Sequence, residues 1–177
     1  MKKGPGKAVS GPLAEGWKKA LRNEVEGREF YRMAAANARL DGVRRMFTFL
    51  MEEEELHREA ILEQIGRMAE GKPPRLVRGA AGKREIRKFR SPLFPPDFLA
   101  RGKGAEGEGA ALSIGMTLEK RAIGQFTALR RKVKGDAAAE KMFEDLIAWE
   151  QDHLKLLTRQ YEQFREMFWV EARFWPF

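Results

Sequence analysis

The stretches Glu54-Glu55-Leu56-His57 and Glu150-Gln151-Asp152-His153 decide the fold of this 177-residue chain. They contain its only two histidines, and each places a glutamate three residues before the histidine. Residues three apart on a helix lie on the same face, so each stretch can present one carboxylate and one imidazole to a single metal ion. Each stretch therefore indicates a helix that carries metal-ligating side chains.

Both stretches interrupt the apolar seam of a predicted helix. Residues of each seam follow one another at alternating steps of four and three, which is the spacing of the inward face of a packed helix. The two seams are Val43, Phe47, Leu50, Glu54, His57, Ile61, Gln64 and Met68, and Ala139, Phe143, Leu146, Glu150, His153, Leu157, Gln160 and Phe164. A carboxylate in a helix core is costly unless it is neutralised, paired or metal-bound, so these four polar groups call for a shared partner.

Two further seams each carry one glutamate near their middle. They are Trp17, Leu21, Glu24, Gly27, Tyr31, Ala34 and Ala38, and Leu112, Met116, Glu119, Ile123, Phe126, Leu129 and Val133. Glu24 lies 30 residues before Glu54 and Glu119 lies 31 residues before Glu150, so the chain consists of two halves offset by 95 to 96 residues. One half supplies three ligand candidates, and the two halves supply six.

The chain resembles the rubrerythrin-like branch of the ferritin-like di-iron carboxylate proteins over roughly residues 13 to 168. The resemblance is carried by residues 24–31, 47–57, 119–126 and 146–153. It implies an all-α fold, an antiparallel four-helix bundle with a long crossover between its second and third helices. It also implies two iron ions, with manganese possible. By the resemblance, Glu54 and Glu150 bridge both ions, Glu24 and Glu119 each cap one ion, and His57 and His153 each bind one ion.

Two departures from the family pattern concern the movement of an iron between redox states and the supply of electrons. Rubrerythrins proper carry another glutamate three residues after the third-helix ligand, where this chain has Ala122. Many of them also carry a small iron domain held by four cysteines, and this chain contains no cysteine. The resemblance implies a di-iron oxidoreductase that reduces hydrogen peroxide or dioxygen with electrons from an external donor protein. A ferroxidase or iron-storage protein of ferritin type, with the same site, is the alternative.

The chain is expected to have a flexible tail over residues 1–12, a bundle over 13–168 and an aromatic tail over 169–177. The predicted helices cover residues 13–40, 42–70, 109–134 and 136 into the aromatic tail, with turns at Asp41-Gly42 and Gly135-Asp136. The crossover over 71–106 must travel the length of the bundle, roughly 42 Å, and about 35 residues suffice for that distance. We expect the aromatic tail to fold back on the bundle or to seal a homodimer.

The net charge of +8 is concentrated in the crossover, where ten basic residues stand against two acidic ones between Lys72 and Lys103. Such a strip could bind nucleic acid, but it has few aromatic residues and no known reading motif. A solvated connection beside the bundle is favoured, and a nucleic-acid partner is not expected. No apolar run of about 20 residues could span a membrane, and residues 1–12 lack the apolar core of a secretion signal. We therefore expect a cytoplasmic protein.

Tyr31 lies two helical turns after Glu24 on the same face, so its phenol is expected near the iron site. As a catalytic residue it could donate a hydrogen bond to a ligand or supply an electron, and a core tyrosine bonded to a buried carboxylate fits equally well. Neighbouring glutamates are expected on solvated helix faces, namely Glu26, Glu29, Glu52, Glu53 and Glu55. Glu53 could instead accept the free N–H of an iron-bound imidazole.

Overall fold

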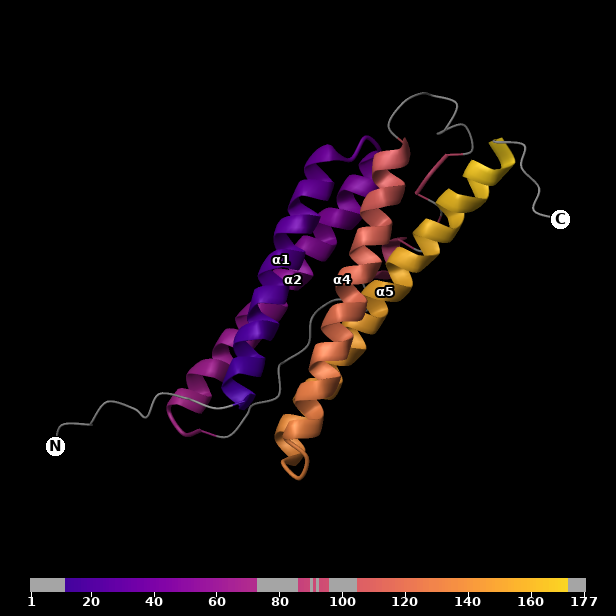
Figure 1. Cartoon of the computed structure of the whole chain (residues 1–177). Helices are drawn as coiled ribbons and strands as arrows, with labels where there is room; N and C mark the ends of the chain where they lie inside the picture. The colour runs from indigo at the N-terminus through magenta and orange to yellow at the C-terminus, as the bar shows by residue number, and fades with distance from the viewer. Residues whose placement is uncertain (1–11, 73–85, 90, 92, 96–104, 172–177) are drawn as a thin grey trace.

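The computed structural model describes residues 12–72, 86–89, 91, 93–95 and 105–171. Within these ranges the chain forms four long helices and one short 3-10 helix, with no strand. The elements are α1 (Pro12–Asn37), α2 (Asp41–Ala69), η1 (Arg87–Phe89), α4 (Ala105–Lys132) and α5 (Ala137–Glu171). The helical hairpin of α1 and α2 packs beside the hairpin of α4 and α5 (Figure 1). The predicted all-α four-helix bundle is thus confirmed.

The two predicted turns have different outcomes. Gly135 adopts a φ of 99°, and Asp136 Oδ1 accepts the backbone N–H groups of Ala138 and Ala139 at 3.1 and 3.0 Å, so this turn and N-cap are confirmed. The prediction at Asp41-Gly42 is wrong, because the chain turns over residues 38–40 and α2 already begins at Asp41. An acidic residue in the first turn suits the positive end of the helix dipole, which explains its place inside the helix.

Helix α4 begins four residues earlier than predicted, at Ala105 instead of Gly109. Its added first turn is tied to the bend between α1 and α2, since the buried Glu108 accepts the backbone N–H of Arg39 at 2.9 Å. Gly109 lies so close to Phe164 of α5 that a Cβ atom would sit 2.4 Å from the ring. A glycine near the helix start therefore permits close packing and does not prevent helix formation.

Part of the crossover belongs to the core. The ring of Phe89 packs against that of Phe49 of α2, tilted by 37° with the ring centroids 5.5 Å apart. Phe94 contacts Phe164 of α5 edge to face, with the ring centroids 5.4 Å apart. Gln160 of α5 fastens this segment by donating to the Phe89 carbonyl at 2.8 Å and accepting the backbone N–H of Leu93 at 3.2 Å. The prediction of a solvated connection is therefore wrong for these residues, while most of its basic residues lie outside the described ranges.

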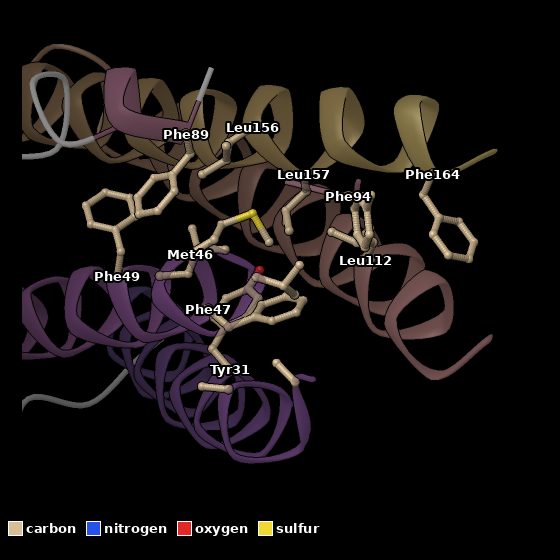
Figure 2. Packing of buried hydrophobic residues seen from close by; sticks show 14 residues of the cluster. Tyr31, Met46, Phe47, Phe49, Phe89, Phe94, Leu112, Leu156, Leu157 and Phe164 are labelled. Carbon is tan, nitrogen blue, oxygen red and sulfur yellow. The ribbon is translucent and has the colours of Figure 1, made fainter. Parts of the chain in front are cut away.

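Two apolar clusters fill the bundle. Along every long helix they are separated by the six predicted ligands. The Phe47 cluster contains Tyr31, Ala35, Ala38, Val43, Met46, Phe47, Phe49, Leu50, Phe89, Phe94, Leu112, Leu156, Leu157 and Phe164 (Figure 2). The Phe143 cluster contains Trp17, Ala20, Ile61, Ala122, Phe126, Leu129, Met142, Phe143 and Leu146. The layer that holds Glu54 and His57 is therefore enclosed from both directions by apolar side chains.

The aromatic end of the chain begins inside α5. Phe168 and Trp169 are 46% and 38% exposed on the last turns of this helix and contact each other edge to face. Residues 172–177 and residues 1–11 lie outside the described residues, so of the N-terminal tail predicted over 1–12 only Pro12 is described, and it begins α1. None of the described helices is apolar enough over a sufficient length to cross a membrane.

Candidate metal centre

The six predicted ligands come from all four long helices and are no more than 4% exposed. Helix α1 contributes Glu24 and α4 contributes Glu119, one from each hairpin. Helices α2 and α5 contribute a glutamate and a histidine each. The seam positions read from the sequence therefore correspond to buried positions at one level of the bundle.

The two imidazoles show which carboxylates belong together. His57 Nδ1 lies 2.9 Å from Glu150, 3.3 Å from Glu24 and 3.8 Å from Glu54. His153 Nδ1 lies 3.8 Å from Glu119, 3.8 Å from Glu150 and 4.0 Å from Glu54. Among the described contacts, the carboxylates of α2 and α5 approach both histidines, whereas those of α1 and α4 approach one each. This is the arrangement that two bridging and two capping carboxylates require.

Four of these groups converge closely enough for metal binding. One ligand atom from each of Glu54, His57, Glu150 and His153 lies within 4.8 Å of the others, and all four side chains are buried. Glu24 and Glu119 extend this cluster through their contacts with the two imidazoles. The structure thus brings all six predicted residues together.

Several buried atoms of this layer have no hydrogen-bond partner in the part of the chain that the structure describes. They are both carboxylate oxygens of Glu24 and of Glu150, both ring nitrogens of His57 and Nδ1 of His153. The 2.9 Å approach of His57 to Glu150 lacks the angle of a hydrogen bond. Buried polar atoms without partners are costly, and cations would satisfy them. Oxygen-rich ligands with two imidazoles suit iron or manganese, so the donor set fits the metal that the resemblance implies.

Crowding of four carboxyl groups perturbs their protonation. Burial and then the charge of Glu150 raise the pKa of Glu24 and of Glu119 well above 4.5. Burial and then the charge of Glu24 raise the pKa of Glu54 in the same way. Burial alone would raise the pKa of Glu150 too, but the positive charge available on His57 and contacts with the surrounding ligands hold it well below 4.5. Without a cation, the site therefore retains protons that metal binding would displace.

The pKa of His153 also departs from its ordinary value. Burial by itself would lower this pKa, but the carboxylates of Glu150 and Glu53 raise it well above 6.5. Glu53 is buried and its carboxylate lies 3.8 Å from His153 Nε2, so the expected solvated position of Glu53 is wrong. Glu53 instead faces the outer nitrogen of His153, which is the alternative position predicted for it. Glu26 and Glu52 are exposed as predicted.

Two other side chains shape the site. Tyr31 is fully buried and its hydroxyl donates a hydrogen bond to Glu119 Oε1. This is the hydrogen bond to a buried ligand carboxylate that the sequence predicts. Gly27 faces Glu54 across α1 and α2, and a Cβ atom there would lie 3.3 Å from the carboxyl carbon. The glycine therefore leaves room for the carboxylate that approaches both histidines.

A comparison with protein families matches this chain over residues 17–161 to the family described as Rubrerythrin. The chain belongs to the rubrerythrin family. The matched range contains all six converging residues, and together with the buried carboxylate and histidine cluster it supports a di-iron protein. No curated protein and no solved structure matches the chain significantly.

Proposed function

We propose that this rubrerythrin-family protein is a di-iron oxidoreductase that reduces hydrogen peroxide, or dioxygen, with electrons from an external donor. The observation that carries the proposal is that Glu54 and Glu150 each approach both imidazoles inside a closed apolar bundle. Two iron ions held side by side would supply two electrons together, and with two protons these convert one peroxide molecule into two molecules of water.

The ligand roles in this proposal follow the contacts. Glu54 and Glu150 would be shared by the two ions, Glu24 and His57 would complete one position, and Glu119 and His153 would complete the other. Because these side chains come from rigid, well-packed helices, their positions are set by the fold and not by the metal. The two apolar clusters exclude bulk water from the layer, which strengthens the electrostatic interactions inside it.

Tyr31 acts in this proposal as a positioning residue, because its hydroxyl proton points at Glu119. Its hydroxyl fixes the orientation of one carboxylate oxygen by hydrogen bonding. Burial and the neighbouring charge of Glu119 raise the pKa of Tyr31 well above 10.0, so the phenol keeps its proton across the physiological range. A constant hydrogen-bond donor is therefore available to this ligand.

An external electron donor is part of the proposal because none of the 177 residues is a cysteine. The described helices therefore contain no thiolate that could hold a second iron centre beside the bundle. We infer that peroxide alone gives little steady turnover, and that a reductase with a small electron carrier restores it.

Stopped-flow absorbance tests the reaction. The chemically reduced, iron-loaded protein is mixed separately with one equivalent of peroxide and with air-saturated buffer. The proposal requires fast reoxidation by one equivalent of peroxide in a single step. Much faster reoxidation by dioxygen, together with many ferric ions accumulating per chain, would instead identify the iron-storage alternative. The Ala122→Glu variant restores the additional family carboxylate, and it is expected to increase the preference for peroxide over dioxygen.

A further inference from the structure

The two halves of the candidate metal centre have different surroundings. The His57 half is defined here as Glu24 with His57, and the His153 half as Glu119 with His153. The offset of 95 to 96 residues makes these halves equivalent in the sequence, so each neighbour of one half has a counterpart beside the other. Differences between counterparts therefore show how this chain distinguishes two otherwise matching metal positions.

The first difference concerns the capping carboxylates. Tyr31 donates a hydrogen bond to Glu119 in the His153 half. Its counterpart 95 residues later is Phe126, which has no hydroxyl and is buried in the Phe143 cluster. Accordingly, neither carboxylate oxygen of Glu24 has a hydrogen-bond partner among the described residues. Among the described residues, a donor outside the site orients only the capping carboxylate of the His153 half.

The second difference concerns the outer nitrogens of the imidazoles. Glu53 faces His153 Nε2 at 3.8 Å, while Nδ1 of the same ring faces the ligand carboxylates. The counterpart of Glu53 is Trp149, whose ring stacks on His57 at 5.2 Å with an interplanar angle of 7°. Nε2 of His57 has no hydrogen-bond partner in the described chain. An acceptor thus supports one imidazole, and an apolar ring covers the other.

We propose that the His153 half binds the tightly held metal ion and that the His57 half binds the exchangeable one. Partners behind metal ligands fix their orientation and raise their basicity, and loss of such a partner lowers metal affinity about tenfold to hundredfold. The His153 half has two such partners, Tyr31 and Glu53. The counterpart residues of the His57 half, Phe126 and Trp149, offer neither a hydroxyl donor nor a carboxylate acceptor. The proposal rests on the metal centre of the proposed function and adds an order of binding to it.

The test is a titration of the metal-free protein with Mn²⁺, followed by calorimetry and by electron paramagnetic resonance. Two binding events are expected, with affinities that differ about tenfold to hundredfold. The first equivalent should give the spectrum of an isolated ion, and the second should give that of a coupled pair. His57→Gln should retain the first event, and His153→Gln should lose it.

Substitution of the outer partners tests their positioning role without touching a ligand. Tyr31→Phe and Glu53→Gln should each weaken the first binding event and reduce the difference between the two. Tyr161→Phe removes the hydroxyl of the chain's only other tyrosine and is the matched control, with no expected change. Phe126→Tyr adds a hydroxyl at the counterpart of Tyr31 and should strengthen the second event.

The outcomes separate this proposal from the proposed function. Two equal affinities, or a first event that His57→Gln removes and His153→Gln retains, would overturn the order of binding while leaving the di-iron oxidoreductase intact. An unchanged difference in both Tyr31→Phe and Glu53→Gln would also overturn it. Failure to bind two metal ions at all would overturn both proposals together. Far-ultraviolet circular dichroism of each variant shows that the bundle has folded.

Discussion

The polar middle layer of this bundle and the apolar clusters beside it are built in opposite ways. In the clusters, rings pack directly on one another, as Trp17 does on Phe143 at 4.7 Å and Tyr31 on Phe47 at 6.1 Å. In the middle layer, carboxylates and imidazoles are buried with atoms that have no hydrogen-bond partner in the described part of the chain. Apolar burial contributes about 25 cal/mol per Å², whereas buried unpaired polar atoms each cost about 1–3 kcal/mol. The clusters thus stabilise the fold, and the middle layer is stabilised only when cations are bound.

The largest expected effect is on metal content. Glu54→Ala should lose both metal ions because this carboxylate approaches both histidines, whereas His57→Ala should lose mainly one ion per chain. Metal analysis of the purified variants is the measurement. Equal losses in the two variants would contradict the bridging role of Glu54.

Removing a large side chain from either cluster should have the next largest effect, on stability. Phe47→Ala and Phe143→Ala should each lower the free energy of unfolding by about 3–5 kcal/mol, since both rings are fully buried. Urea denaturation of the metal-free proteins provides the measurement.

In contrast, Glu54→Gln should leave the metal-free protein as stable as wild type or more stable, because it removes a buried acid from a crowded site. A clear destabilisation by Glu54→Gln would show that the empty polar layer is not strained.

The pH dependence of stability should differ between metal-free and metal-loaded protein. The pKa values of Glu24, Glu54 and Glu119 are raised in the folded state, so above pH 4.5 the folded protein binds more protons than the unfolded protein. The free energy of unfolding therefore falls as the pH rises through the folded-state pKa values of these groups. The raised pKa of His153 acts in the same direction above pH 6.5.

Glu150, with a lowered pKa, stabilises the fold above pH 4.5 and loses this effect only as the pH falls below that value. The melting temperature of metal-free protein should therefore fall as the pH rises above about 5. The increase caused by Mn²⁺ should grow over the same interval, because metal ligands must be deprotonated. Parallel pH profiles with and without metal would contradict this assignment.

A smaller effect is expected from Gly27→Ala. The added methyl group would lie 3.3 Å from the carboxyl carbon of Glu54, so the carboxylate must move by a few tenths of an ångström. Metal affinity should fall by about tenfold or less while the helix itself gains stability, since alanine is favoured over glycine in helices. Gly124→Ala on α4 is the matched control, because no described residue outside its own helix comes within 4 Å of a Cβ atom there. Equal metal affinities for the two variants would show that space at Gly27 is not required.

The sequence predicted the parts of the site that follow helical periodicity. Glu54 and His57 occupy positions of an apolar seam, and burial of such a seam places its polar members inside. The helical period predicts a solvated Glu53, because its partner His153 belongs to another helix and the period of one helix contains no information about that neighbour. Which imidazole Glu53 faces, and the stacking of Trp149 on His57, follow only from contacts between α2 and α5.

Other errors came from segments without periodicity. Phe89 and Phe94 lie in a crossover rich in proline, glycine and basic residues, so nothing in the pattern indicated that they reach the core. Similarly, glycines near residue 109 obscured the start of α4, which depends on a hydrogen bond between Glu108 and the distant Arg39. Contacts between segments far apart in the chain fix these features.

Iron content and coupling test the central claim most directly. Metal-free protein is loaded anaerobically with excess Fe²⁺, freed of unbound metal and examined by metal analysis and Mössbauer spectroscopy before and after oxidation. We predict two iron ions per chain, which become an antiferromagnetically coupled diferric pair on oxidation, because Glu54 and Glu150 approach both histidines. One uncoupled iron per chain, or none, would contradict the shared site.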